Sequence, residues 1–529
     1  NGTFTHLTWS NATGALAFIT ATLDDKEKPS PASLWLWNPE NAKASEAIPA
    51  DSVRKGWILP SKNDLTWTKD GKRLFFGFRP VNSSDTKAEE KKDSTIDLFD
   101  TDALLKKREV DIWHWNDPRI ISNQKNRWKT VKEQTYRAVY HIETKQMVQL
   151  ADSQMPVVDL TDNPSVTLGR SNVPYLKAIT WDGEYNDLYI VNLKTGARTK
   201  VAARLGGPAT LSPRGGFVLF YDDKNWFLHK VADGSTHNLT EPLTVAFYDE
   251  EDDTPDPPGP YGFGGWVDGE SSVLLYDKYD LWQFSTETGK AQNVTDGFGR
   301  KNDLTFRIQK LDPDAKFYNQ NERLLLTAYH NTKKYTAFYS ATLGKTGVEK
   351  LVEGPKRFTF LLKARRADKI LYTRQSYAEF PDIWVSDVAL KGARKISDLN
   401  PQVSEFAWGS AELVDWQSLD GKPLQGVLIR PGNYKPGKRY PLLVYFYELS
   451  SQRLHEFNQV VVNHRPCFPF YASNGYAIFL PDVRFEIGRP GFSATKCIVP
   501  GVQKLIEMGV VDPKAIALHG HSWSAPWRS

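Results

Sequence analysis

Ser522 is the residue of this sequence best placed to act as a nucleophile. It lies in the string Gly520-His521-Ser522-Trp523-Ser524, directly after the apolar run Ala515–His519. A sharp turn from a strand into a helix lifts a serine hydroxyl clear of the sheet, and small neighbours let the backbone pass without clashes. The amide after the serine then faces a developing oxyanion. The pattern predicts acyl-transfer chemistry at Ser522; an ordinary serine in a loop after a strand is the alternative.

Two histidines flank Ser522 and could suggest a metal pair. We expect the side chains of His519 and His521 to diverge as the chain leaves the strand, and no further cluster of ligands is nearby. The sequence therefore predicts neither a metal nor a cofactor. We expect His521 to pack beside the turn, and neither histidine to act as the base for Ser522.

A serine nucleophile needs a base and a group that orients the base. In folds built around this turn, the acid and then the histidine follow the serine along the chain. Only seven residues follow Ser522, and none is Asp, Glu or His. We therefore expect this chain alone to be inactive as a triad enzyme. Three explanations stay open. The chain is an incomplete product of a longer enzyme, it is completed by a second chain, or it is a truncated form that binds peptides or proteins without catalysis.

The elements that must position Ser522 begin near residue 405. Residues 413–429 suggest a hairpin, and the Pro, Gly and Lys residues of 431–438 suggest a linker. Uniformly apolar segments at 442–447, 476–482 and 515–519, which we expect to be strands, then alternate with segments expected to be helical, one of them at 498–508. Continuous apolar strands separated by helices predict a parallel sheet buried on both faces.

Residues 1–405 repeat one sequence pattern at intervals of about 40 to 50 residues. A Gly turn leads into an apolar strand, a polar break, a second strand with Trp or Tyr, and a short closing strand; the clearest copies begin at Ser212 and Val267. No segment of this region shows a long helical period. The repeat predicts a β-propeller of seven or eight four-stranded blades, with a β-sandwich array as the alternative.

Two stretches depart from the repeat. Residues 81–109 are rich in Lys, Asp, Glu and Ser, and are expected to form a long solvated insertion. Residues 249–260 combine consecutive carboxylates with several prolines, which prevent regular structure. This stretch is either a solvated loop or a substrate-binding one, in which Glu250 or Glu251 pairs with the amine of a substrate.

The composition narrows the class of protein. The chain has 529 residues, 40% of them hydrophobic, and its 17 Trp, 22 Tyr and 27 Phe favour β structure. Lys and Arg exceed Asp and Glu by four, without a basic stripe, so nucleic-acid binding has little support. No apolar run is long enough for a membrane span.

The cysteines and the sequons bear on the compartment. Cys467 and Cys497 are expected to be separate buried thiols, with a single bridge as the alternative. The chain begins at Asn1 without Met, which suggests a processed or trimmed form. Its five Asn-x-Ser/Thr sequons permit glycosylation. The compartment stays open, with a secreted or periplasmic location favoured over a cytoplasmic one.

Several motifs between residues 405 and 523 together resemble the prolyl oligopeptidase family of serine peptidases, which includes dipeptidyl peptidases and acylaminoacyl peptidases. The remainder of the chain resembles the propeller of that family in organisation only. The resemblance predicts a propeller over residues 1–405 and an incomplete α/β-hydrolase domain over 406–529. The motifs are Trp416 with Asp420-Gly421, residues 439–445, Asn474-Gly475-Tyr476, residues 481–484, residues 488–491, and Gly520-His521-Ser522-Trp523.

The resemblance also implies roles for individual residues. Ser522 would be the nucleophile, and the hydroxyl of Tyr445 would join the amide of Trp523 in the oxyanion hole; Tyr447 is the competing tyrosine. The propeller would cap the site and admit only short or unfolded peptides. The expected partner is a peptide substrate, and a homo-oligomer is left open. An inactive propeller that binds peptides or proteins is the alternative function.

Overall fold

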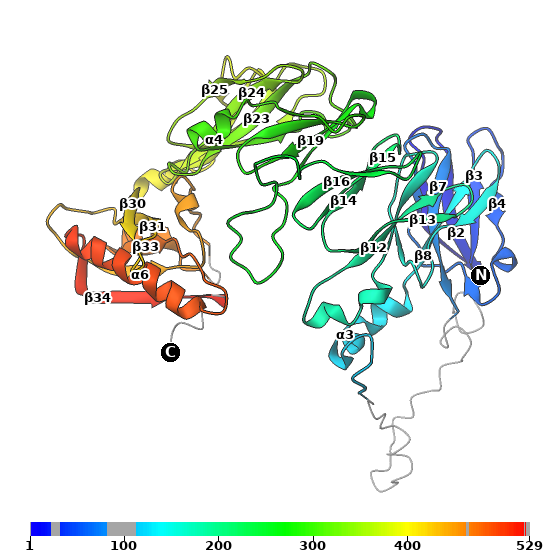
Figure 1. Cartoon of the computed structure of the whole chain (residues 1–529), viewed down its shortest axis with the longest axis horizontal. Helices are drawn as coiled ribbons and strands as arrows, with labels where there is room; N and C mark the ends of the chain where they lie inside the picture. The colour runs from blue at the N-terminus through cyan, green and yellow to red at the C-terminus, as the bar shows by residue number, and fades with distance from the viewer. Residues whose placement is uncertain (1, 23–31, 82–112, 462–464, 523, 525–529) are drawn as a thin grey trace, which may run out of the picture. The chain divides into compact units, whose positions relative to one another are not determined.

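The computed structural model describes residues 2–22, 32–81, 113–461, 465–522 and 524. The chain is mostly β and divides into two compact units (Figure 1). Unit 1 contains residues 1–222 and 227–237, and unit 2 contains residues 223–226 and 238–529. The predicted insertion at 81–109 lies outside the described residues except for Val81. No described helix is long and apolar enough to cross a membrane.

Unit 1 is a succession of antiparallel sheets, each built from strands that follow one another in the chain. The first is β1 (Gly2–Trp9), β2 (Leu16–Thr22), β3 (Ser33–Trp37) and β4 (Ser45–Ile48); the second is β5 (Trp57–Ile58), β6 (Thr66–Trp67), β7 (Arg73–Pro80), β8 (Tyr136–His141) and β9 (Gln146–Gln149); the third is β10 (Val157–Val158), β11 (Val166–Ser171), β12 (Asn186–Asn192) and β13 (Arg198–Leu205). The fourth, at the division of the units, is β14 (Ala209–Leu211), β15 (Phe217–Asp222), β16 (Asn225–Lys230) and β17 (Thr236–Asn238).

Unit 2 continues with three sheets of the same kind. They are β18 (Phe263–Val267), β19 (Ser272–Tyr276), β20 (Leu281–Ser285) and β21 (Ala291–Asn293); β22 (Leu304–Gln309), β23 (Arg323–His330), β24 (Thr336–Thr342) and β25 (Val348–Val352); and β26 (Arg357–Lys363), β27 (Ile370–Ser376), β28 (Glu379–Ser386) and β29 (Arg394–Lys395). A short helix, α4 (Phe298–Asn302), precedes β22.

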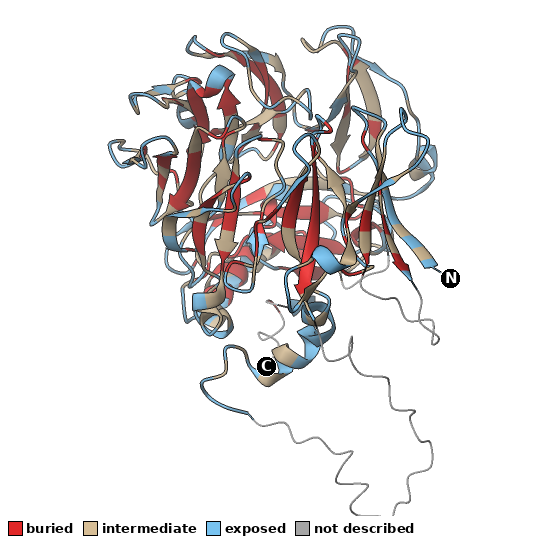
Figure 2. Cartoon of the chain, turned by 90° about the vertical axis from the view of Figure 1, so that its right-hand side faces the viewer, coloured by how far each residue is buried: buried red, intermediate tan, exposed pale blue. Residues whose placement is uncertain are grey.

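These sheets have the organisation of propeller blades, as the sequence repeat predicted. The inner strands of these sheets are the most buried (Figure 2). The apolar clusters lie between one sheet and the next. The copies recognised at Ser212 and Val267 correspond to β15–β17 and β19–β21, and their closing strands end at Asn238 and Asn293.

The repeat region contains one helix that leaves no helical period in the sequence. Helix α3 (Ile121–Lys132) lies between β7 and β8 and contains no buried residue. Helical periodicity in a sequence comes from an apolar face turned to a core. Because α3 has no such face, its sequence carries no helical period.

The last sheet, in unit 2, is mixed rather than wholly parallel. Its order is β30-β31-β33-β32-β34, with β30 (Ser410–Gln417), β31 (Pro423–Arg430), β32 (Tyr440–Tyr445), β33 (Ala477–Pro481) and β34 (Val511–His519). The strands β30, β31 and β33 pair antiparallel, whereas β33, β32 and β34 pair parallel. The predicted hairpin at 413–429 is confirmed as β30 and β31.

Two helices connect the parallel strands. Helix α5 (Phe468–Ser473) lies between β32 and β33, and α6 (Pro490–Glu507) lies between β33 and β34, so helices alternate with these strands as predicted. Buried residues of α6 recur at helical spacing, at Ala494, Ile498, Gly501 and Leu505, and Figure 1 shows α6 along one face of the sheet. A Cβ on Gly501 would lie 2.9 Å from the Trp416 ring, so this helix packs very closely on the sheet.

Pro500 interrupts the hydrogen bonds within α6 without leaving a carbonyl unsatisfied. Proline has no N–H to donate to the carbonyl four residues earlier. The carbonyl of Lys496 instead accepts a hydrogen bond from the amide of Leu419, at 3.0 Å. The indole N–H of Trp416 donates to the neighbouring Cys497 carbonyl at 2.8 Å. The β30–β31 turn and α6 are thereby joined.

The edge strand β34 corrects the expectation that every strand of this sheet is buried on both faces. Ile516 and Leu518 are 41% and 45% exposed, whereas β33 is buried throughout. Among the described residues β34 pairs only with β32, so it lacks the cover that β33 receives from both neighbours.

The cysteines are both free, with Cys497 buried and Cys467 half-buried.

Candidate active site

Ser522 lies just beyond the end of β34, in a turn with an unusual backbone. Its φ is 53°, a left-handed value that is uncommon for a residue with a side chain. Ser522 is also exposed. Residues held in sparsely populated backbone regions cluster at functional sites. A strained, outward-facing serine directly after a strand is the local geometry that a nucleophile elbow requires.

The turn around Ser522 closes too tightly for a larger residue at its first position. A Cβ on Gly520 would lie 2.5 Å from the carbonyl oxygen of Ser524. Ser524 is buried, and its hydroxyl accepts from the amide of His521 at 2.7 Å and donates to the carbonyl of His521 at 2.9 Å. Ser524 therefore stabilises the turn through its side chain. Trp523, whose amide was expected to face an oxyanion, lies outside the described residues.

The three parallel strands end at the same edge of the sheet, where open α/β sheets collect their ligands. Tyr445 ends β32 and pairs in register with His519 at the end of β34. The centres of the Tyr445 and His519 rings lie 5.7 Å apart. The Phe468 ring also packs on Tyr445, with 5.6 Å between the two ring centres. Tyr445 is only 7% exposed.

Tyr447 lies in a different environment. The strand that was predicted to run through residue 447 ends at Tyr445, so Tyr447 belongs to the segment that follows β32. It is 39% exposed. Of the two tyrosines considered for the oxyanion hole, Tyr447 is the one with an accessible ring.

Asp482 fixes the segment that carries Tyr447. Its carboxylate, 6% exposed, accepts hydrogen bonds from the amide of Ser451 at 2.7 Å and from the Ser451 hydroxyl at 2.6 Å. The amide of Val483 donates to the carbonyl of Glu448 at 2.9 Å. These bonds tie the chain after β32 to the end of β33. Burial raises the pKa of Asp482, although the hydrogen bonds from Ser451 and the charge of Lys334 act in the opposite direction.

The acidic loop at 249–260 reaches the same edge of the sheet within unit 2. The amide of Phe485 donates to Asp253 at 2.9 Å, and Glu251 lies 3.7 Å from the guanidinium of Arg484. Glu251 also accepts an ion-paired hydrogen bond from Lys278 at 2.7 Å. The loop is therefore attached to the residues that follow β33.

The two carboxylates proposed for substrate binding differ in their partners. Burial would raise the pKa of Glu251, but the hydrogen bond from Lys278 and the positive charges of Lys278 and Arg484 outweigh it, and the pKa is lowered. Glu250 is exposed, and its amide donates to the Tyr261 hydroxyl at 3.0 Å. Glu251 is thus held as a carboxylate between two cations, whereas Glu250 faces solvent.

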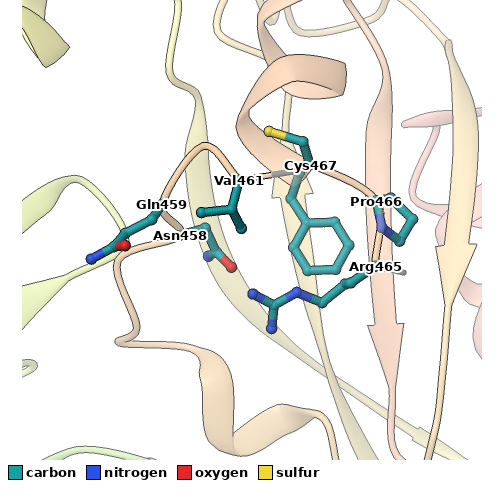
Figure 3. Close-up of a pocket in the computed structure, with 7 residues that line it drawn as sticks. Asn458, Gln459, Val461, Arg465, Pro466 and Cys467 are labelled. Carbon is teal, nitrogen blue, oxygen red and sulfur yellow. The ribbon is translucent and has the colours of Figure 1, made fainter. Parts of the chain in front are cut away.

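A small hollow lies beside α5 (Figure 3). Asn458, Gln459 and Val461 approach it from one stretch of chain, and Arg465 and Cys467 from the next. It also contacts Phe468, the ring that packs on Tyr445. The hollow therefore adjoins the carboxyl end of β32.

Within the described ranges, no three His, Cys, Asp or Glu side chains gather closely enough to hold a metal ion. His519 packs against Tyr445, and His521 is exposed in the turn, where its amide donates to the Ser524 hydroxyl. Sequence reasoning assigned no role to Ser451 and Asp482, because nothing in the sequence shows that residues 31 positions apart form one hydrogen-bonded pair.

No protein-family model matches this sequence, and no curated protein is significantly similar to it. Solved structures do match. One of two prolyl endopeptidases studied for the role of inter-domain dynamics in catalysis and specificity is 12% identical, with a TM-score of 0.50, and the match covers 99% of this chain and 69% of that one.

Two further structures align over similar shares. An acylaminoacyl peptidase of Pyrococcus horikoshii is 13% identical, with a TM-score of 0.42 over 99% of this chain and 74% of its own. A puromycin-hydrolysing peptidase of Mycobacterium tuberculosis is 10% identical, with a TM-score of 0.46 over 98% of this chain and 74% of its own. Over nearly its whole length, this chain is thus similar in fold to about 69% of the prolyl endopeptidase chain.

Proposed function

We propose that this chain belongs to a serine peptidase of the prolyl oligopeptidase family and that Ser522 is its nucleophile. The observation that carries the proposal is the turn after β34: an exposed serine with a φ of 53°, two residues after a glycine that has no room for a side chain. Strand, sharp turn and serine occur in the order that defines a nucleophile elbow. The likeness to the prolyl endopeptidase structure supports the fold.

In this proposal, residues 1–405 form the propeller and residues 406–529 belong to the α/β-hydrolase domain. The acid and the base of the triad would come from sequence that follows Ser522. The exposed apolar side chains of β34, Ile516 and Leu518, are suited to contact with such further elements.

The oxyanion hole would combine the amide of Trp523 with a tyrosine hydroxyl. The exposure of Tyr447 and the burial of Tyr445 favour Tyr447 as the donor. Tyr445 would then support the site by packing between His519 and Phe468. A hydrogen-bond donor accelerates the chemical step when the negative charge on the substrate oxygen that it contacts develops only in the transition state.

The substrate would be a short peptide bound at the carboxyl edge of the sheet. Glu250, which faces solvent, could pair with a substrate amine directly, whereas Glu251 would have to exchange its contact with Lys278. Both carboxylates belong to the loop that the Asp253–Phe485 hydrogen bond holds at this edge.

The test is to express the longest product of the gene that encodes this sequence and to treat it with a fluorophosphonate probe. We expect a covalent adduct at Ser522 and turnover of short peptides, both abolished by Ser522→Ala. Peptide binding by a product that neither reacts with the probe nor turns over peptides would instead support a non-enzymatic binding propeller, the second candidate.

A further inference from the structure

Unit 1 carries an exposed aromatic surface that the proposed peptidase site does not use. Four tryptophans are exposed there by 63% to 86%, although tryptophan is normally buried for most of its area. We call the following residues the tryptophan surface: Trp113, Trp115, Ile120, Trp128, Val131 and Trp181. Contiguous apolar area of this kind on a soluble domain marks an interaction site.

The members of this surface come together from two parts of the chain. Residues 113–121 and residues 177–181 line one hollow, which includes the rings of Trp113, Trp115 and Trp181. The ammonium of Lys177 lies 5.7 Å from the centre of the Trp115 ring and donates to the side chain of Asn116. The hollow continues at Ile121 into α3, which carries Trp128 and Val131.

Helix α3 presents these residues outward. None of its residues is buried, and Figure 1 shows it beyond the ends of the unit 1 strands. An isolated helix of about 12 residues is marginal in water, because most helical stability in proteins comes from packing. A surface that α3 could pack against would therefore stabilise it.

The charges around the tryptophan surface are mainly positive. Residues 113–133 contain five Lys or Arg residues and two acidic ones. Lys125, Arg127 and Lys129 of α3 are exposed. Two neighbouring carboxylates already face cations: Glu133 lies 3.9 Å from Arg79, and Asp182 lies 2.7 Å from Arg204. A third, Glu184, is exposed, and its charge acts on Arg119.

We propose that the tryptophan surface docks unit 1 onto an anionic lipid bilayer. Tryptophan favours the lipid–water interface, where its ring is apolar and its N–H remains hydrated. Basic residues beside such rings are attracted to anionic headgroups. The cores of protein–protein interfaces are, by contrast, depleted of lysine. Tryptophan interleaved with several lysines therefore fits a membrane surface better than a protein partner.

The test is co-sedimentation of the whole chain with vesicles of phosphatidylcholine alone or mixed with phosphatidylglycerol. We expect binding to the mixed vesicles only, with a blue shift of tryptophan emission, and loss of binding when NaCl is raised to about 0.5 M. Reversal of Lys125, Arg127 and Lys129 to Glu should weaken binding about tenfold or more. The matched control reverses Lys43, Arg54 and Lys55, which are exposed elsewhere on unit 1.

A second variant tests the aromatic contribution. Replacement of Trp113, Trp115 and Trp181 by Ser should abolish the blue shift, whereas Trp9→Ser, at another exposed tryptophan of unit 1, should preserve it. Circular dichroism establishes that each variant is folded. The proposal is overturned if the unmodified chain ignores anionic vesicles, or if the variants bind as well as their controls. If the unmodified chain self-associates but does not bind vesicles, and the tryptophan variant no longer self-associates, the surface contacts a second copy of the chain instead.

Discussion

The carboxylate of Asp482, at the end of β33, accepts two hydrogen bonds from Ser451, which follows β32: one from the amide at 2.7 Å and one from the hydroxyl at 2.6 Å. This pair links two parallel strands at the edge where the proposed site lies. It also places an ionisable group in a buried environment, because Asp482 is only 6% exposed.

The first prediction concerns the pH dependence of stability. Burial raises the pKa of Asp482 in the folded protein, so the unfolded state holds the carboxylate more readily. The raised pKa of Asp482 therefore stabilises the folded protein fully below the unfolded pKa of about 4. This stabilisation is lost as the pH rises through the folded pKa. Relative to Asp482→Asn, the unmodified protein should lose stability as the pH rises above about 4, the pKa of the unfolded carboxyl.

Urea unfolding at several pH values measures this difference. Ser451→Ala provides a matched comparison. It removes one hydrogen bond to the Asp482 carboxylate, which raises the folded pKa further, so the loss of stability with rising pH should be larger. A stability difference that stays constant with pH would show that Asp482 titrates normally.

The second prediction concerns the turn at Ser522. Gly520→Ala should lower the free energy of unfolding by about 1 to 3 kcal/mol, because its Cβ would meet the backbone of Ser524. Gly354→Ala, at a glycine with open space around it, should change stability by less than about 0.5 kcal/mol. Equal effects of the two variants in urea unfolding would contradict the close approach.

The third prediction separates the two tyrosines in the catalytically competent gene product. Tyr447→Phe should lower kcat for a short peptide by about 100-fold or more, because an oxyanion donor would be lost. Tyr445→Phe should change kcat much less, because its buried ring still packs against His519 and Phe468. Steady-state kinetics of both variants decide between them, and a larger loss for Tyr445→Phe would reverse the assignment.

The fourth prediction concerns the acidic loop. Glu250→Gln should raise KM for peptides with a free amino terminus about fivefold, the value of one exposed charge pair, and leave N-acetylated peptides unaffected. Glu251→Gln should act less selectively, because it also releases Lys278 and Arg484. If neither variant distinguishes free from acetylated peptides, the loop does not recognise the amine.

Much of the architecture could be predicted from the sequence because it is encoded locally. Glycine turns and apolar runs recur in each sheet, as in the copies at Ser212 and Val267, and each run pairs with its neighbour in the chain. Helix α6 was partly predictable because its buried face recurs at helical spacing. Helix α3 was not, because none of its residues faces a core.

The candidate site was only partly predictable for a related reason. The string around Ser522 is contiguous, so its type and spacing are visible in the sequence. The Ser451–Asp482 pair and the contacts of Glu251 with Lys278 and Arg484 join distant segments. The sequence also did not show where β32 ends, and that boundary separates the environments of Tyr445 and Tyr447.

Fluorophosphonate labelling of the longest product of the gene, with the adduct located by peptide mass spectrometry, decides whether Ser522 is the nucleophile. We expect one adduct, on Ser522, that Ser522→Ala eliminates together with peptide turnover. Turnover that survives Ser522→Ala, or an adduct on another serine that accounts for the activity, would contradict this assignment.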